Sequence, residues 1–133
     1  MCAKPSGQAM VEFAGVALTF FALLFGIFEM GIVVYRYNTV CQAAREAVRY
    51  AVVHSPTSQN PATKDQIVGV AVNYAPFLAA GEVTVNFTPD TNPHLVNQTD
   101  AVVSISHTYI QNIPLMSAVT LTLTSSSQML VSQ

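Results

Sequence analysis

The 133-residue chain has few charged side chains, and this scarcity narrows the kinds of protein that it can be. Lys, Arg, Asp and Glu make up 9% of the residues, whereas a soluble globular domain has about 25%. The basic residues form no run and the net charge is −2, so the chain lacks the basic patch of a nucleic-acid-binding protein. With 51% hydrophobic residues and a mean hydropathy of +0.42, the composition predicts a protein that is partly buried in a membrane or an assembly.

Motifs for disulfides, metals and catalysis are also missing. The two cysteines, Cys2 and Cys41, are too few for a disulfide framework and form no Cys-x-x-Cys pair. The three histidines share no metal-ligand spacing, and the sequence has no glycine-rich phosphate loop. His107 alternates with Val103 and Ile105 on one strand face, which favours a hydrogen-bonded, partly buried histidine over a ligand. We therefore expect a protein that is not an enzyme and that uses no cofactor, metal or small-molecule substrate.

The most prominent feature that is present is the apolar segment SGQAMVEFAGVALTFFALLFGIFEMG, Ser6 to Gly31. It holds no charge from Phe13 to Phe28, a run that spans roughly 24 Å as a helix, and the wider stretch over residues 11–34 spans roughly 36 Å. A hydrocarbon core is about 30 Å thick, so residues 8–34 are predicted to form one transmembrane helix. The alternative is a core helix, but the rest of the chain is too short to wrap it.

The residues that follow continue the helix with a different pattern. In VVYRYNTVCQAAREAVRYAVVHSP, apolar side chains recur at spacings of three or four, at Val33, Tyr37, Val40, Ala44, Val48 and Ala51. Ser55-Pro56 is expected to end the helix. The sequence therefore predicts one helix from about Ser6 to about Val53, with an amphipathic second half over residues 35–54.

Residues 55–133 begin with signals for a short second helix. Thr63 and Gln66 have the spacing of a capping box, and apolar residues follow them. Pro76 is expected to stop this helix. The pattern predicts a short helix over about residues 64–75.

The sequence beyond this helix alternates between apolar and polar residues. The alternation predicts strands over about residues 82–88, 101–110 and 118–125, and Pro89 to Pro93 has the composition of a turn. Three successive strands favour an antiparallel sheet, whose apolar face the amphipathic half of the long helix would cover. The expected fold class is therefore α+β.

Two carboxylates stand out in the apolar segment. Glu12 lies five residues after Gly7. Glu29 directly follows the uncharged run and lies between Gly26 and Gly31. A carboxylate in hydrocarbon costs about 2.5–3.5 kcal/mol on insertion scales, so it is usually paired or functional. The alternative for Glu12 is a place among lipid headgroups. For Glu29 the alternatives are a subunit contact, with the two glycines allowing close helix approach, and a water-facing position at the outer membrane surface.

The residues around Gly7 resemble a known processing site. Gly7 followed by Gln8, Glu12 and Phe13 is similar to the cleavage region of type IV prepilins. Together with YRYNTVCQAAREAVRYA, the segment GQAMVEFAGVALTFFALLFGIFEMG resembles the TadE-like minor pilins, or pseudopilins, of the tight-adherence (Tad/Flp) pilus system. The resemblance covers about residues 7–53 and implies a pilin-like fold, in which a long helix packs on a small antiparallel sheet.

This resemblance also implies a processing and assembly mechanism. A prepilin peptidase would remove the leader, residues 1–7, by cutting between Gly7 and Gln8. Glu12 and Phe13 would then be the fifth and sixth residues of the mature chain, and Glu12 would pair with the amino group of Gln8 in a neighbouring subunit. The other implied partners are a major pilin, other minor pilins and the inner-membrane assembly platform, with a role in pilus assembly and adhesion.

The resemblance further implies a place in the bacterial cytoplasmic membrane. The chain would cross it once, with the N-terminus inside and residues 55–133 forming an extracytoplasmic domain, and would join a surface pilus. Charge counting alone points the other way, because Arg36, Arg45 and Arg49 follow the span whereas Lys4 precedes it. The alternative function is a single-span, membrane-anchored binding or scaffold module that does not polymerise.

Overall fold

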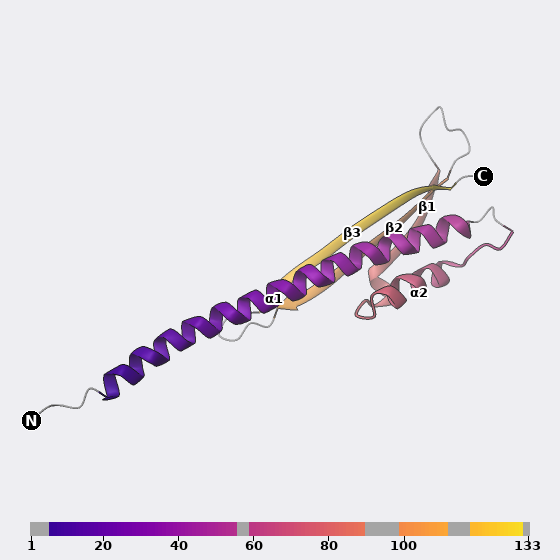
Figure 1. Cartoon of the computed structure of the whole chain (residues 1–133). Helices are drawn as coiled ribbons and strands as arrows, with labels where there is room; N and C mark the ends of the chain where they lie inside the picture. Colours follow the sequence, from indigo (N-terminus) through magenta and orange to yellow (C-terminus); the bar gives the residue numbers. More distant parts are fainter. Residues whose placement is uncertain (1–5, 56–58, 90–98, 112–117, 132–133) are drawn as a thin grey trace, which may run out of the picture.

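The computed structural model of the chain describes residues 6–55, 59–89, 99–111 and 118–131. Its elements follow in the order α1 (Ser6–Val53), α2 (Lys64–Tyr74), the 3₁₀ turn η1 (Ala80–Glu82), β1 (Val83–Pro89), β2 (Thr99–Gln111) and β3 (Val119–Val131). A long helix, a short helix and a three-stranded antiparallel sheet make up the predicted α+β fold (Figure 1). Cys2, most of the leader, Pro56 and the turn residues 90–93 lie outside the described residues.

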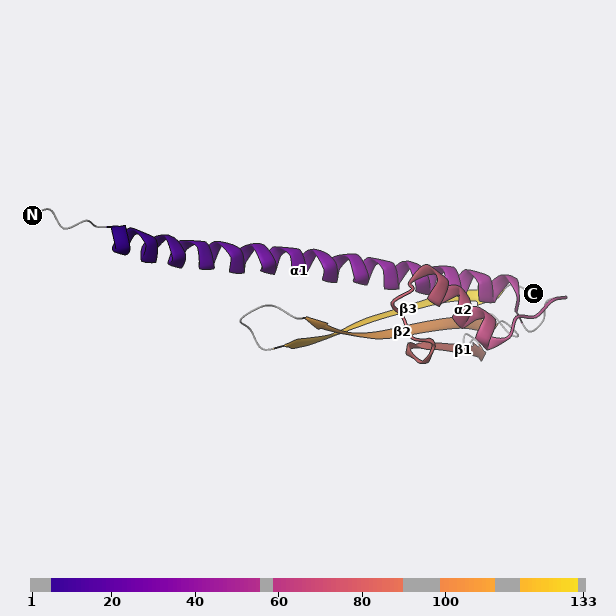
Figure 2. The same cartoon turned by 90° about the horizontal axis from the view of Figure 1, so that it is seen from below.

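The helix α1 is continuous over 48 residues, as the sequence predicted. Its N-terminal half projects beyond the sheet and α2 (Figure 2), and its large apolar side chains there are exposed. Within the described part of the chain, α1 is the one helix that is long and apolar enough to cross a membrane, and none of its most apolar stretch is buried against the rest of the molecule.

The C-terminal half of α1 presents a face of small residues to the rest of the fold. The fully buried side chains on this face are Val40, Ala43, Ala44, Ala47, Val48 and Ala51. Because alanine side chains are short, the sheet and α2 can both approach the helix backbone closely. Tyr37, which the spacing placed on the same stripe, is largely exposed because it precedes the stretch of α1 that is fully covered.

The helix α2 begins with the expected capping box. The Thr63 hydroxyl accepts a hydrogen bond from the N–H of Gln66, at 3.3 Å, and the Gln66 side-chain oxygen accepts one from the N–H of Thr63, at 2.9 Å. These two bonds satisfy N–H groups that a helix start leaves unpaired. Ile67 and Ala71 are buried in the common core with α1, which fixes α2 against the long helix.

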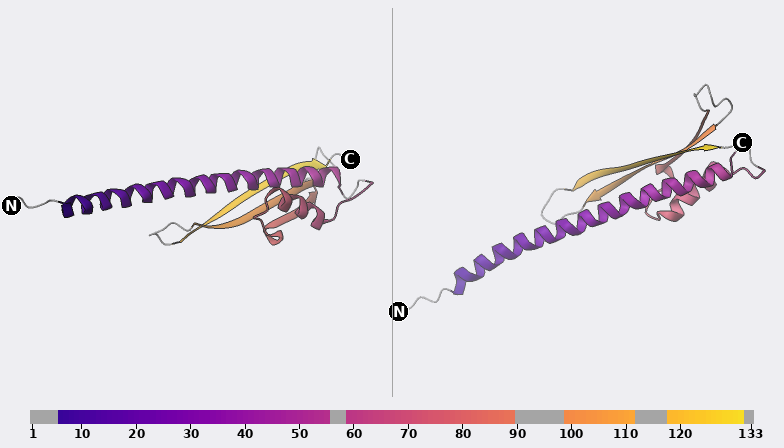
Figure 3. Two further views of the ribbon diagram at one scale, coloured as in Figure 1. Left: turned by 60° about the horizontal axis from the view of Figure 1, so that its bottom comes forward. Right: turned by 45° about the horizontal axis from the view of Figure 1, so that its top comes forward.

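The sheet has the strand order β1-β2-β3, and both pairs are antiparallel. One face is covered, because α1 contacts β2 and β3 while α2 contacts β1. Figure 3 shows β2 and β3 running alongside α1. The inward side chains include Val83, Val85, Val103 and Ile105, which are buried.

The strand β3 ends at Val131. The sequence predicted an end at about residue 125, because the apolar alternation stops there. Ser125, Ser126 and Ser127 interrupt that alternation but still pair with β2, opposite Ile105, Ser104 and Val103. The backbone ladder therefore extends the strand where the side-chain pattern gives no signal. The turn η1 was not predicted either, because three residues are too few to show a period.

Candidate functional site

The four residues of the expected processing and assembly site lie on the first turns of α1. Gly7 is the second residue of the helix, and a Cβ added to it would meet no atom within 4 Å. The Gln8 side-chain amide donates a hydrogen bond of 3.3 Å to the carboxylate of Glu12, one turn further on. Gln8, Glu12 and Phe13 are all exposed in the projecting half of α1.

This position makes the Gly7–Gln8 bond accessible. The first four N–H groups of a helix have no acceptor within the helix, so opening its first turn costs few hydrogen bonds. Glu12 lies nearly two turns from the start of α1. The geometry thus places an exposed backbone bond near the Glu12 carboxylate.

A second group of polar and aromatic side chains in mutual contact lies where the apolar half of α1 ends. We call it the exit cluster; its members are Glu29, Arg36, Phe77, Glu82, His107 and Tyr109. The hydroxyl of Tyr109 donates a hydrogen bond of 2.8 Å to the half-buried carboxylate of Glu29. This bond is the main cause that raises the pKa of Tyr109, with burial and the negative charge of Glu29 acting in the same direction. Glu29 therefore has a partner in its own chain.

Arg36 occupies the centre of the exit cluster. Its guanidinium carbon lies 4.5 Å from the ring centre of Tyr109 and 5.0 Å from that of Phe77, distances at which cations attract aromatic faces. One guanidinium nitrogen, Nη1, is 3.3 Å from Nε2 of His107. Arg36 thus links the helix to β2 and to the segment after α2.

The neighbours of His107 determine which ring nitrogen carries its proton. A guanidinium can only donate, so Nε2 of His107 must accept the hydrogen bond from Arg36. The proton then lies on Nδ1, which is 3.1 Å from both carboxylate oxygens of Glu82 and donates to them. His107 is buried and hydrogen-bonded, which confirms the interpretation made from its place on the strand.

Glu82 is held by its backbone neighbours as well as by His107. Its carboxylate accepts hydrogen bonds from the N–H of Ala79, at 2.9 Å, and from the N–H of Thr108, at 3.4 Å. Burial alone raises the pKa of Glu82, but the hydrogen bonds from Ala79, His107 and Thr108 together outweigh it and lower the pKa. Glu82 therefore joins η1 to β2 as a charged, multiply bonded acceptor.

The sequence contains a partial signal for the exit cluster. Glu29 and Arg36 are seven residues apart, nearly two helical turns, so they share one face of α1. His107 and Tyr109 are two residues apart and share the inward face of β2. Both pairs were visible, but nothing in the spacing showed that these two faces meet.

The glycines that flank Glu29 have open surroundings. A Cβ added to Gly26 or Gly31 would meet no atom within 4 Å. Neither glycine is therefore required by packing inside this chain, and the proposed contact with another helix at Gly26, Glu29 and Gly31 stays a prediction.

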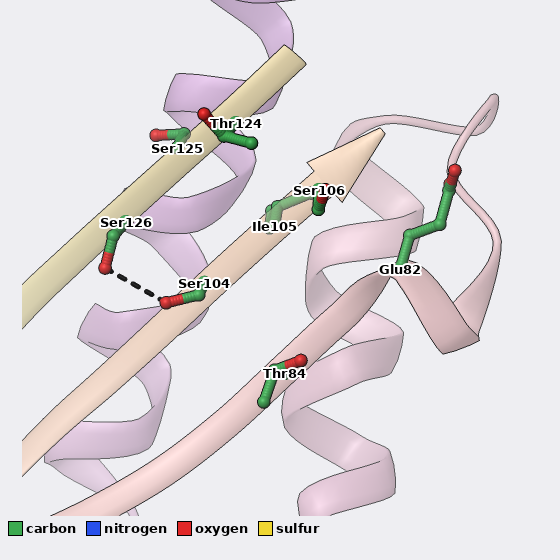
Figure 4. Close-up of a pocket in the computed structure, with 8 residues that line it drawn as sticks. All are labelled: Glu82, Thr84, Ser104, Ile105, Ser106, Thr124, Ser125 and Ser126. Atoms are coloured by element: carbon green, nitrogen blue, oxygen red, sulfur yellow. Dashed lines mark hydrogen bonds between the residues drawn. The ribbon is translucent and has the colours of Figure 1, made fainter. Parts of the chain in front are cut away.

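The outward face of the sheet carries a shallow hollow of about 300 Å³. Figure 4 shows its lining, which consists of Glu82, Thr84, Ser104, Ile105, Ser106, Thr124, Ser125 and Ser126. The hydroxyls of Ser104 and Ser126 lie 3.0 Å apart, and the Glu82 carboxylate points away from them (Figure 4). Within the described residues, no group of three or more His, Cys, Asp or Glu side chains could hold a metal ion.

The part of α1 that carries the expected processing site and the helix residues of the exit cluster matches a protein family. Residues 7–49 match the family model described as TadE-like protein. No curated protein and no solved structure matches the chain significantly. The matched segment runs from Gly7 through Glu12, Glu29 and Arg36, so it covers both ends of the apolar half of α1. The family resemblance read from the sequence is thus confirmed over residues 7–49, which are similar to TadE-like proteins.

Proposed function

We propose that this chain is a minor pilin, or pseudopilin, which is cut by a prepilin peptidase and then takes part in Tad/Flp pilus assembly and adhesion. The observation that carries the proposal is the TadE-like match, which begins at Gly7, the residue after which the peptidase would cut. The projecting apolar half of α1 supports it, because such a helix needs a membrane or neighbouring helices to cover it.

The exposed start of α1 supports processing at Gly7–Gln8. In the uncut chain the only group bonded to Glu12 among the described side chains is the Gln8 amide, which is neutral. Cleavage creates an ammonium group at Gln8, and this group can neutralise the Glu12 carboxylate of an adjacent subunit. Phe13 would follow as the first apolar residue of the buried helix.

The open surroundings of Gly26 and Gly31 support a helix contact in the assembled state. Glycines let two helix backbones approach closely in a membrane, and both glycines face free space in the isolated chain. Glu29, between them, has Tyr109 as a partner in its own chain and so remains satisfied when a second helix approaches. The neighbours would be a major pilin or another minor pilin, delivered through the inner-membrane assembly platform.

We further propose that α1 crosses the cytoplasmic membrane once, with the N-terminus inside and the sheet outside. The stretch Arg36–Arg49 then lies outside the cytoplasm, against the charge-counting rule. Arg36 contacts His107 and two aromatic rings. We therefore give its positive charge less weight when the basic residues on the two sides of the span are compared.

The decisive experiment is the N-terminal mass of the protein purified from cells that contain the cognate peptidase. We expect the loss of residues 1–7 and a mature chain that starts at Gln8. Gly7→Ala should block this loss, whereas Gly15→Ala, a glycine with equally open surroundings on the same helix, should not. An intact N-terminus in the presence of active peptidase would favour the alternative, a permanently anchored module that does not polymerise.

A further inference from the structure

One end of the sheet lies level with the end of the apolar half of α1. Tyr109 of β2 reaches Glu29, which directly follows the uncharged run that ends at Phe28. The strand β2 continues for two residues past Tyr109, and β3 begins at Val119 opposite Gln111. Figure 2 shows this end of β2 and β3 extending past α2 toward the N-terminal half of α1.

Two apolar side chains at this end of the sheet are exposed, beside the polar residues Gln111 and Thr120. Ile110 is 60% exposed and Val119 is 42% exposed. The neighbouring exposed side chains further along the outward face are polar, among them Thr108, Thr122 and Thr124. On the outward face of β2 an exposed isoleucine, Ile110, thus follows Thr108 next to Tyr109, which reaches Glu29; Thr120 lies opposite it on β3.

Aromatic residues mark the same level on the helix. Tyr35 is 67% exposed and Tyr37 is 47% exposed. Both lie within about 12 Å of Glu29 along the helix axis. Tyrosine is enriched where a membrane meets water, because its ring is apolar and its hydroxyl is polar. These tyrosines and Tyr109 form a belt at the end of the span.

We infer that this end of the sheet, with Ile110 and Val119 at its tip, rests in the headgroup layer of the bilayer into which α1 inserts. The inference rests on the membrane anchoring in the proposed function. The occupant is the lipid surface rather than another protein, because the apolar tip is continuous with the membrane span through the Tyr109–Glu29 bond. Strand edges with unpaired backbone groups cannot enter hydrocarbon, which limits the tip to the interface.

The contact should be apolar rather than electrostatic. Arg36 is the nearest basic residue, and it is engaged by His107, Phe77 and Tyr109. Binding of the tip should therefore not depend on anionic lipid. The membrane would support the sheet from below, and the sheet would keep a fixed height above the bilayer until the subunit is extracted.

The absence of tryptophan from the chain allows a direct test. We would place a single tryptophan in the full chain with Ile110→Trp and reconstitute it in phosphatidylethanolamine vesicles, with and without phosphatidylglycerol. The acyl chains would carry bromine just below the headgroup, which quenches nearby indole fluorescence. Leu130→Trp is the matched control, since Leu130 is 49% exposed on the same face but at the opposite end of β3. Phe20→Trp, measured in matching vesicles whose acyl chains carry bromine near their ends, reports on insertion of the span.

We expect brominated lipid to quench the indole at position 110 at least twofold, equally with and without phosphatidylglycerol, and to leave that at position 130 unchanged. Quenching at position 20 without quenching at position 110 would overturn this inference and leave the proposed function intact. A lack of quenching at position 20 would overturn both. An emission blue shift at position 110 that requires high protein density, with no lipid quenching, would identify a second copy as the occupant and reject the lipid contact.

Discussion

The hydroxyl of Tyr109 donates a 2.8 Å hydrogen bond to the carboxylate of Glu29, which lies 80 residues earlier in the chain. This bond joins the end of β2 to the point where the apolar half of α1 gives way to the covered half. Arg36, stacked on the Tyr109 ring, adds a second link two turns further along the helix. The sheet is therefore fixed to the helix next to the proposed membrane boundary, as well as through the alanine face further along.

Removing the Tyr109 hydroxyl should weaken this link. Hydrogen bonds to charged groups contribute about 1.5–3 kcal/mol, and partial exposure places this one near the lower value. Tyr109→Phe should therefore lower the free energy of unfolding by about 1.5 kcal/mol, measured by urea denaturation of the full chain in detergent micelles. Tyr74→Phe, at an exposed tyrosine of α2, is the control and should have no comparable effect.

A double-mutant cycle with Glu29→Gln separates the bond from other effects of the substitutions. The two single variants should each lose stability, and the double variant should lose less than their sum, with a coupling of about 1 kcal/mol. Additive losses would contradict a direct interaction between the two side chains.

Arg36 should not be replaceable by lysine. The planar guanidinium stacks between two rings and donates to His107, whereas an ammonium cannot reproduce both contacts. We expect Arg36→Lys to lower the free energy of unfolding by about 1–2 kcal/mol, comparable with the loss in Arg36→Ala. Arg45→Lys, at an exposed position on α1, is the control. If Arg36→Lys were as stable as the unmodified chain, a positive charge alone would be sufficient for the stabilising role of Arg36.

The hydrogen-bond directions at His107 predict a single neutral tautomer. Nitrogen NMR of the full chain in micelles at neutral pH should find the proton on Nδ1 and a bare Nε2. In Arg36→Ala, Nε2 loses its donor, and its nitrogen shift should change while Nδ1 stays bonded to Glu82. A protonated Nε2 in the unmodified chain would contradict the donor role of Arg36.

Glu82 should make the fold sensitive to acid. Its pKa is lowered in the folded chain, so its contribution to stability is present above the ordinary glutamate value of about 4.3 and is lost as the pH falls through the lower folded value. Thermal unfolding should therefore find Glu82→Gln less stable than the unmodified chain at pH 7. The gap should narrow as the pH falls below about 4. If the stability difference between the two proteins stayed constant over this pH range, Glu82 would act through its packing and neutral hydrogen bonds rather than through its charge.

The sequence was sufficient for the two α-helices and the existence of the three strands, because each leaves a local signal. The uncharged run and the following stripe predicted α1, Thr63 and Gln66 predicted the start of α2, and alternation predicted three strands. The end of β3 was missed because Ser125 to Ser127 carry no apolar period, although their backbone pairs with β2. Strand ends that depend on a partner strand cannot be read from one strand alone.

The exit cluster shows the same limit for the functional residues. Glu29 was noticed because a carboxylate beside an apolar run is costly, and His107 because it lies among apolar neighbours. Their partners, Tyr109 and Glu82, come from other elements: the packing of β2 on α1 brings Tyr109 to Glu29, and the contact of η1 with β2 brings Glu82 to His107. Sequence reasoning therefore identified residues in need of partners but not the partners themselves.

The charge on Glu12, rather than its hydrogen bond to Gln8, should determine assembly. We expect Glu12→Gln to insert in the membrane and to be processed, because an uncharged side chain does not disturb the apolar helix. Its incorporation into pili should fall on the order of 100-fold, since the ammonium of the neighbouring subunit then loses its counter-charge in hydrocarbon at a cost of about 2.5–3.5 kcal/mol. Gln8→Ala removes the 3.3 Å side-chain bond but retains the amino group formed by cleavage, so it should assemble normally. Quantitative immunoblots of sheared pili and of membranes measure both variants. Normal incorporation of Glu12→Gln would reject the charge pair, and equal losses in the two variants would assign the effect to the local Gln8–Glu12 bond instead.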